Sequence, residues 1–329
     1  MSQDIMFAGG TVLAADSLYV DFKVPRGPFA HQDLHALAGI SLRLRAGSCL
    51  GVVGESGCGK STLARALLRL VPLAGGAVRW LDRDITNLSA RELRPLRRYV
   101  QFVAQDPAGS LDPRRTIAST IAELIYVHEP TVGRAQCAIR TREAMRQVGL
   151  DERLADRFPH ELSGGQAQRV GIARALAVRP KVLICDEPVS ALDVSVQAQI
   201  VNLLLRLKDE LDLALVFISH NLAVVRQLAD EVMVLYLGRV LERGDAHALY
   251  ARPRHPYTRA LLDAVPAPTP HVARPHPLAL GEPPSPTSPP SGCVYHPRCP
   301  YAQPLCRSTR PRLEATDSGF VGCHFWREL

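Results

Sequence analysis

The stretch GESGCGKST, at Gly54–Thr62, matches the phosphate-binding pattern G-x-x-x-x-G-K-[ST]. An apolar run at Leu50–Val53 precedes it and a helical pattern at Ser61–Leu70 follows it, which is the strand–loop–helix context that the pattern requires. Glycines let the backbone curl so that successive N–H groups face one anion, and the helix adds its positive N-terminal end. We therefore expect a nucleotide-binding loop made of Gly54, Glu55, Ser56, Gly57, Cys58, Gly59, Lys60, Ser61 and Thr62.

Three side chains of this loop have distinct expected roles. Lys60 supplies a compact charge for the β- and γ-phosphates, and Ser61 offers a hydroxyl to Mg²⁺. Cys58 lies inside the loop, and nothing near it in the sequence supplies a base, so it is interpreted as a small filler rather than a nucleophile.

A second apolar run, Val182–Asp186 within VLICDEP (Val182–Pro188), is a predicted strand with two adjacent acids at its end. Because neighbouring residues on a strand point in opposite directions, Asp186 can reach Mg²⁺ while Glu187 turns toward the terminal phosphate. Phosphoryl transfer requires metal clamping and an oriented water more than covalent chemistry. Glu187 is therefore the candidate base or water-orienting group; an ordinary solvated acidic turn is the alternative.

The amino-acid composition limits the classes of protein to which this chain can belong. The chain has 329 residues, 47% of them apolar, which allows two domains or one large domain with an appendage. The net charge is +7, but no basic run is dense enough to form a nucleic-acid patch, and the excess of arginine over lysine is interpreted as a genome-wide bias. No apolar run approaches the roughly 20 residues of a membrane span, and no basic leader marks a signal peptide. In a reducing cytoplasm, eight cysteines are not expected to form a disulfide framework.

Apolar strand patterns alternate with helical ones along the first 250 residues. Further strands are predicted at Tyr99–Ala104 and Leu215–Ser219, and further helices at Ala135–Val148, Gln166–Val178 and Val196–Leu211. This alternation predicts an α/β fold with a mostly parallel sheet covered on both faces. Residues 106–178 contain no clear strand and are expected to form an inserted helical unit.

Three further motifs carry a family resemblance: LSGGQ at Leu162–Gln166, SALD at Ser190–Asp193 and ISH at Ile218–His220. With the two motifs above, they make the chain resemble the ATP-binding subunits of ABC transporters over about residues 17–250. The resemblance implies a RecA-like P-loop core with a helical subdomain at about 106–178, within an ATPase domain at 1–250. It also implies a head-to-tail dimer that holds two ATP molecules, each between the phosphate loop of one subunit and the LSGGQ of the other.

The resemblance also assigns roles to single residues. Ser163, Gly164, Gly165 and Gln166 would meet the γ-phosphate presented by the partner subunit, as the bare amides of a helix N-terminus can do. Gln105 would contact Mg²⁺ and report to the membrane subunits, His220 would hold the γ-phosphate, and Asp193 would help to position the opposite site. Phe22 is the candidate for stacking on adenine, with an ordinary strand aromatic as the alternative.

The sequence after residue 250 resembles the extension found in dipeptide and oligopeptide permease ATPases. RHPYTRALLDAVP, at Arg254–Pro266, carries the HPY motif, and His255, Pro256 and Tyr257 are expected to cap and dock the extension by packing. Ten prolines between Val265 and Gly292 predict an extended connector, so residues 251–292 are assigned to the HPY segment and linker, and residues 293–329 to a cysteine-rich tail.

Four cysteines of the tail, Cys293, Cys299, Cys306 and Cys323, follow the spacing C-x5-C-x6-C-x16-C. A segment of under about 40 residues rarely folds by itself, and a four-thiolate metal centre would supply stabilisation. The close cysteine pairs of structural zinc are absent, and the resemblance favours a [4Fe–4S] cluster, with Zn²⁺ and free buried thiols as alternatives. His296 and His324 are less favoured substitute ligands. We expect a structural role and no redox path to the ATP site.

The combined prediction is an ATPase, using ATP and Mg²⁺, that drives di- or oligopeptide import from the cytoplasmic face of the inner membrane, where it is a peripheral protein. The partners implied by the resemblance are a second, paralogous ATPase subunit, two membrane permeases and an extracytoplasmic solute-binding protein, without nucleic acid. The alternatives are the same machine carrying nickel, a glycopeptide or another small solute, a soluble ABC ATPase acting on ribosomes or DNA, and an iron–sulfur redox regulator.

Overall fold

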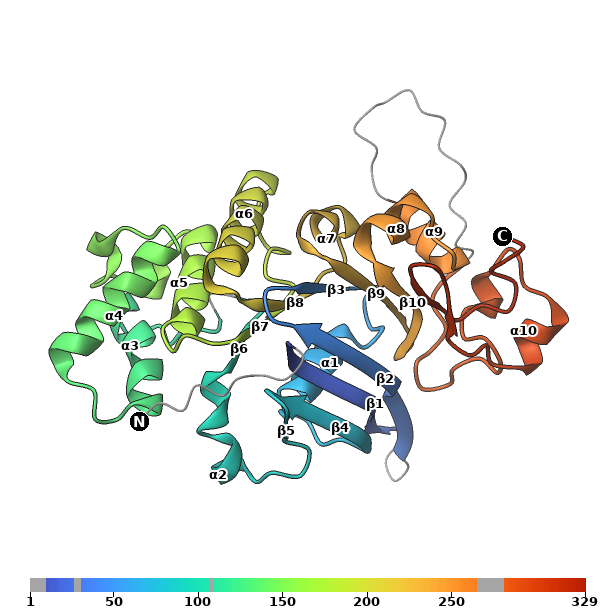
Figure 1. Cartoon of the computed structure of the whole chain (residues 1–329), viewed down its shortest axis with the longest axis horizontal. Coiled ribbons are helices and arrows are strands. Elements are labelled where there is room, and N and C mark those ends of the chain that lie inside the picture. The colour runs from blue at the N-terminus through green and yellow to red at the C-terminus, as the bar shows by residue number, and fades with distance from the viewer. Residues whose placement is uncertain (1–9, 27–30, 107–108, 265–280) are drawn as a thin grey trace. The chain divides into compact units, whose positions relative to one another are not determined.

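The computed structural model describes residues 10–26, 31–106, 109–264 and 281–329 (Figure 1). These residues belong to two compact units. The first unit comprises Met1–Ala14, Arg43–Ser48 and Arg79–Ile218, and the second comprises Ala15–Leu42, Cys49–Val78 and Ser219–Leu329.

The sheet of the first unit is parallel. It contains β6 (Val100–Val103), β7 (Val182–Asp186) and β8 (Ala214–Ile218), with β7 in the middle. Every residue of β7 and β8 is buried, as expected for parallel strands that read as continuous apolar runs. All three strands were predicted from the sequence within one residue at each end.

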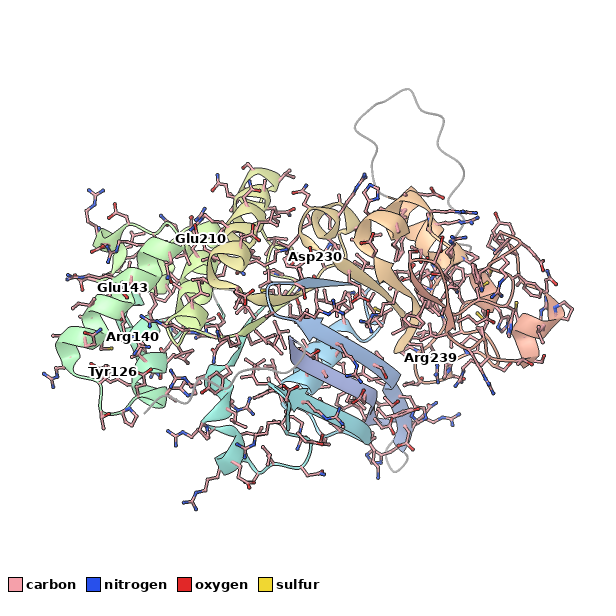
Figure 2. All side chains as sticks on the ribbon, viewed as in Figure 1. Tyr126, Arg140, Glu143, Glu210, Asp230 and Arg239 are labelled. Atoms are coloured by element: carbon pink, nitrogen blue, oxygen red, sulfur yellow. The ribbon has the colours of Figure 1, made fainter. Side chains whose placement is uncertain are left out.

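Helices dominate the part of the first unit that lies between β6 and β7. They are α3 (Ile117–His128), α4 (Arg134–Gln147) and α5 (Gly164–Leu176), and no strand occurs among the described residues of 106–178, as predicted. Arg140 of α4, labelled in Figure 2, donates to Glu129 Oε2 at 2.6 Å and to the Ala177 carbonyl at 2.9 Å. One guanidinium from the middle of α4 therefore contacts the C-terminal ends of both α3 and α5. The first unit also contains the short α2 (Ala90–Leu93) and the long α6 (Val194–Leu211).

The second unit carries a mixed sheet in the order β11-β12-β10-β9-β3. Its strands are β3 (Cys49–Val53), β9 (Glu231–Tyr236), β10 (Arg239–Asp245), β11 (Glu314–Ala315) and β12 (Gly319–Val321). Only the β3–β9 pair is parallel. The described residues of this unit form five α-helices: α1 (Lys60–Leu67), α7 (Leu222–Leu228), α8 (Ala246–Ala251), α9 (Pro256–Asp263) and α10 (Pro304–Ser308).

The cysteine-rich tail is built into this sheet. Strand β12 pairs with β10 in the register Glu242↔Val321, and Val321 is fully buried. Backbone pairing and buried apolar side chains therefore hold the tail onto the second unit. The sequence argument, which relied on a metal centre alone, did not anticipate this source of stability.

A separate sheet has the order β2-β1-β4-β5. It contains β1 (Thr11–Pro25), β2 (His31–Arg45), β4 (Gly75–Trp80) and β5 (Arg83–Asp84). These strands were not predicted from the sequence. In β2 buried and exposed residues alternate, and the continuous apolar run of β1, residues 12–15, covers only four of its 15 residues. None of the described helices is long and apolar enough to cross a bilayer.

Candidate functional site

The phosphate loop follows the buried strand β3 directly and ends at helix α1. Two of its glycines have no room for a side chain. A Cβ on Gly54 would lie 2.2 Å from the Leu235 carbonyl oxygen, and one on Gly59, which has φ of 107°, would lie 2.7 Å from that of Ala36. The loop can curl close to its neighbours only because these positions are glycine.

Lys60 lies across the loop that it follows. The side chain is 5% exposed, and Nζ donates to the carbonyl oxygens of Gly54 at 2.8 Å and Glu55 at 2.9 Å. The ammonium group is thus already directed into the loop, where it can exchange these carbonyls for phosphate oxygens. Ser61 follows it in the first turn of α1.

Cys58 is 4% exposed, and burial raises the pKa of its thiol. A protonated buried thiol is a poor nucleophile, which agrees with its interpretation as a filler. All eight cysteines of the chain lie in the described ranges, and none of them is in a disulfide there.

In the first unit, the structure brings Gln105 and Glu187 together. Gln105 Nε2 donates to Glu187 Oε2 at 3.3 Å, while the Glu187 N–H donates to the Ile218 carbonyl at 2.9 Å. Glu187 has φ of 47°, a left-handed conformation that costs free energy in a residue with a side chain. Asp186, the last residue of β7, is 4% exposed. Asp186 is thus buried at the end of β7, while Glu187 lies in the turn that follows.

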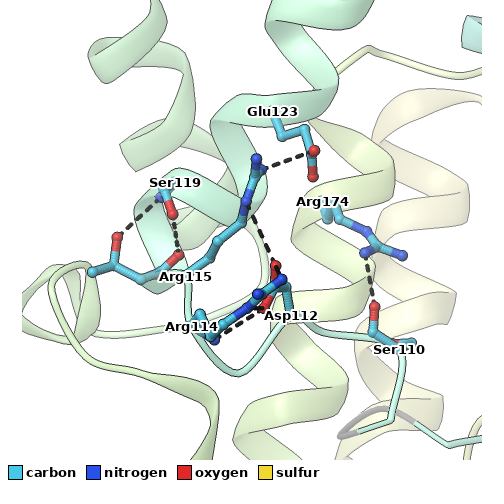
Figure 3. A network of polar contacts seen from close by, with 8 residues as sticks. Ser110, Asp112, Arg114, Arg115, Ser119, Glu123 and Arg174 are labelled. Atoms are coloured by element: carbon cyan, nitrogen blue, oxygen red, sulfur yellow. Dashed lines mark hydrogen bonds and ion pairs between the residues drawn. The ribbon is translucent and has the colours of Figure 1, made fainter.

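The segment that follows Gln105 is anchored to the helices of the first unit (Figure 3). Arg115 pairs with Glu123 of α3 at 2.8 Å, and Arg174 of α5 donates to the Ser110 carbonyl at 3.1 Å. Burial lowers the pKa of Arg174, which still carries its charge at neutral pH. These contacts join residues 110–115 to α3 and α5.

The LSGGQ motif forms the start of α5. Ser163 is the N-cap: its hydroxyl accepts from the Gln166 N–H at 3.3 Å, and Gln166 Oε1 accepts from the Ser163 N–H at 3.0 Å. Gly164 and Gly165 form the first helical turn, and a Cβ on Gly165 would lie 2.6 Å from Val196 Cγ1 of α6. This capping box fixes the helix end whose amides the motif was expected to present.

The remaining predicted residues occupy different elements. Asp193 is exposed at the N-cap of α6 in the first unit. His220 is exposed just before α7, and Phe22 is half-buried on β1, both in the second unit. The phosphate loop belongs to the second unit, whereas Gln105, Ser163, Asp186 and Glu187 belong to the first.

In the second unit, the HPY motif caps and docks the extension as expected. His255 is the N-cap of α9, and its Nδ1 accepts from the Tyr257 N–H at 3.0 Å. His255 is 1% exposed and Tyr257 is fully buried. The Tyr257 hydroxyl also accepts from the Glu55 N–H of the phosphate loop at 2.9 Å, a contact that no local feature of the sequence indicated.

The four tail cysteines line one small pocket with His296 and His324. Burial, followed by the neighbouring thiols, raises the pKa of Cys293 and of Cys299 to about 11 each. The donor types suit a tetrathiolate centre, but across 10–26, 31–106, 109–264 and 281–329 no three His, Cys, Asp or Glu side chains are placed to hold a metal ion. The arrangement therefore does not support the expected metal centre.

Comparisons with known proteins agree with this geometry. Residues 37–190 match the ABC transporter family, and residues 241–306 match the family described as oligopeptide/dipeptide transporter, C-terminal region. The oligopeptide transport ATP-binding protein OppF of Salmonella typhimurium is 51% identical over 292 residues, covering 88% of this chain and 87% of that protein. The di/tripeptide transport ATP-binding protein DppF of Pseudomonas aeruginosa is 48% identical over 315 residues, covering 95% of this chain and 97% of that protein.

Solved structures show the same fold. A dimeric ATP-binding cassette in a post-hydrolysis state, bound to ADP and Pi, has a TM-score of 0.64 and 28% sequence identity, and the match covers 71% of this chain and 98% of that one. The fold is therefore the α/β P-loop fold of ABC ATPase cassettes, as predicted. Taken with the high identity to its relatives, this means that the chain belongs to the ABC transporter ATP-binding proteins, in the group that carries the oligopeptide/dipeptide transporter C-terminal region.

Proposed function

We propose that this chain is the ATP-hydrolysing subunit of an ABC importer that moves di- and oligopeptides through two membrane permease subunits. The observation that carries the proposal is one polypeptide that joins a formed phosphate loop to the oligopeptide/dipeptide C-terminal region at residues 241–306. The named relatives are oligopeptide and di/tripeptide transport ATP-binding proteins. Peripheral association with the inner membrane and delivery of peptide by a solute-binding protein follow from this role.

The proposed chemistry is attack of a water on the γ-phosphorus of ATP. The bond to the ADP oxygen breaks, and the water proton passes to Glu187, which Gln105 orients through its amide. Lys60, the loop amides and His220 stabilise the charge on the transferred group. Ser61, Asp186 and Gln105 are the proposed Mg²⁺ ligands, and Phe22 is the proposed adenine platform.

The proposal includes a paired assembly. A helix N-terminus with a fixed cap and two glycines is suited to a γ-phosphate that a second subunit presents, so we assign Ser163, Gly164, Gly165 and Gln166 to the partner's nucleotide. Asp193 would help to position the opposite site. The partner is proposed to be a paralogous ATPase subunit.

The decisive experiment replaces Glu187 by Gln in the assembled transporter. The amide cannot accept the water proton, so ATP turnover is expected to fall about 100-fold or more while ATP still binds. Phosphate release and ATP binding are the two measurements. Glu210→Gln is the matched control, because Glu210 is an exposed residue of α6 whose pair with Arg206 is a surface i,i+4 contact. Turnover near the wild-type rate in Glu187→Gln would remove Glu187 from this role.

For the tail, we propose that Cys293, Cys299, Cys306 and Cys323 hold a [4Fe–4S] cluster, with Zn²⁺ as the alternative. The proposal rests on the resemblance and on the spacing of the four cysteines rather than on the geometry of the pocket, and the cluster would add structural stability. Anaerobically purified protein is expected to contain about four iron and four sulfide per chain, lost in Cys299→Ser. About one zinc per chain would favour the alternative, and four titratable thiols without metal would reject both.

A further inference from the structure

Arg298 of the cysteine-rich tail forms a bidentate ion pair with the phosphate loop. Its Nη1 donates to Glu55 Oε2 at 2.7 Å and its Nη2 donates to Glu55 Oε1 at 3.0 Å, across 243 residues of sequence. The Arg298 residue is only 6% exposed and directly precedes Cys299. A fork-to-carboxylate geometry with so little solvent access is the kind of ion pair whose loss has a measurable effect.

Glu55 is held at every polar group. Its side chain meets Arg298, its N–H donates to the Tyr257 hydroxyl at 2.9 Å, and its carbonyl accepts from Lys60 Nζ at 2.9 Å. Two of these three partners come from the chain after residue 250, and the third is the lysine of the phosphate loop. The C-terminal extension therefore fixes the loop at the residue that Lys60 uses to orient itself.

An aromatic cluster holds Arg298 in place. The rings of Tyr236, Tyr257 and Tyr295 lie with centroids 4.8, 5.2 and 5.5 Å apart, and all three residues are buried. The guanidinium lies 5.8 Å from the centroid of the Tyr236 ring and donates to its hydroxyl at 3.3 Å. Burial alone would lower the pKa of Arg298, but hydrogen bonds to Glu55 and Tyr236 raise it above its ordinary value. The cation is therefore permanent and its position is fixed.

The negative charge of Glu55 is unfavourable for ligand binding in a loop that binds a polyphosphate. A carboxylate in an anion-binding loop repels the ligand unless a cation neutralises it, and no neighbouring loop residue other than Lys60 is basic. We propose that Arg298 is a positioning residue for ATP: it neutralises Glu55 and holds the loop open for the triphosphate, so that ATP affinity depends on the docked tail. This inference rests on the proposed ATPase function.

The test compares three variants of the full chain in the assembled transporter. Arg298→Gln leaves Glu55 charged and unpaired, so the dissociation constant for a fluorescent ATP analogue and the KM for ATP are expected to rise about tenfold, with kcat changed less than about twofold. In the double variant Glu55→Gln/Arg298→Gln no charge remains, and both values are expected to return to within about threefold of wild type. Arg254→Gln is the matched control, because it removes another arginine–carboxylate pair that holds the tail, Arg254–Asp317, in which neither residue belongs to the phosphate loop.

Each outcome decides the inference. The inference is overturned if Arg298→Gln binds ATP with wild-type affinity. It is also overturned if the double variant binds ATP as weakly as Arg298→Gln does, because the ion pair would then only attach the tail. If Arg298→Gln does not fold, the double variant still tests the inference. Arg298→Lys keeps the positive charge, so its dissociation constant and KM for ATP are then expected to stay within about threefold of wild type. A wild-type transporter without ATP turnover would instead refute the proposed function.

Discussion

His255 is a buried titratable side chain whose neutral form is built into the structure. Its Nδ1 must be unprotonated to accept from the Tyr257 N–H, and burial lowers the pKa of the imidazole from 6.5 to about 3. The backbone N–H of His255 donates to Glu242 Oε2. Burial raises the pKa of this carboxyl group. The cap of α9 is therefore an acid-sensitive point of the second unit.

Acidification should destabilise the protein through this histidine. Between pH 6.5 and pH 3 the unfolded chain binds a proton that folded His255 does not, so stability is full above 6.5 and falls as the pH falls, by about 1.4 kcal/mol per unit. From pH 7 to pH 5 the expected loss is about 2 kcal/mol, measured by denaturant unfolding at each pH.

The matched variant is His255→Asn. Asparagine can cap α9 but does not titrate in this range, and Glu242 contributes equally to both proteins. Its stability should therefore depend less steeply on pH between 7 and 5 than that of the wild type. Equal slopes would mean that His255 is not the acid-sensitive group.

At the scale of elements, the same capping box starts two helices of the first unit. Ser89 with Glu92 caps α2, and Ser163 with Gln166 caps α5. The two capping boxes satisfy the backbone amides at equivalent positions of their own helices. Replacing either serine by alanine should therefore lower helix stability by about 1 kcal/mol. Only the α5 cap lies in the motif assigned to the partner's γ-phosphate.

Ser163→Ala should therefore reduce ATP turnover by about tenfold or more, because a hydroxyl and a fixed helix end are both lost where the partner's nucleotide is expected. Ser89→Ala, with the same loss of a cap, should stay within about twofold of wild type. The measurement is the ATPase rate of the assembled transporter together with thermal unfolding of each variant. Similar rates for the two variants would show that the α5 cap acts only on helix stability.

Elements with strong local signals could be predicted. The runs at β3, β7 and β8 are continuous and apolar, and the helix after the phosphate loop follows from its pattern. Helix α1 ends earlier than predicted because Arg69 adopts a left-handed φ of 53°, which the sequence does not mark. The three-residue strand β12 has no periodicity to detect, since its partner β10 decides where it forms.

At the scale of the whole molecule, motifs predicted candidate site residues but not their contacts. Lys60 was assigned from the phosphate-binding pattern, Asp186 and Glu187 from the end of a predicted strand, and Ser163 from the family resemblance. The Gln105–Glu187 hydrogen bond and the Arg298–Glu55 pair join residues 82 and 243 positions apart, and single-sequence patterns do not report such separations. From the sequence we expected no redox path from the tail to the ATP site. The structure shows a contact of another kind, the Arg298–Glu55 ion pair between the tail and the phosphate loop.

That contact makes ATP binding and tail docking thermodynamically reciprocal. If the docked tail raises ATP affinity about tenfold, bound ATP must stabilise the docked tail by the same factor, about 1.4 kcal/mol.

Two tail amides report on docking: the Cys293 N–H, which donates to the Cys306 carbonyl, and the Arg298 N–H, which donates to the Tyr295 carbonyl. With saturating ATP, hydrogen exchange across residues 293–306 should slow by up to about tenfold in the wild type. In Glu55→Gln/Arg298→Gln, which should still bind ATP, this protection should largely disappear. Equal protection in both proteins would show that ATP and the tail are not coupled through this pair.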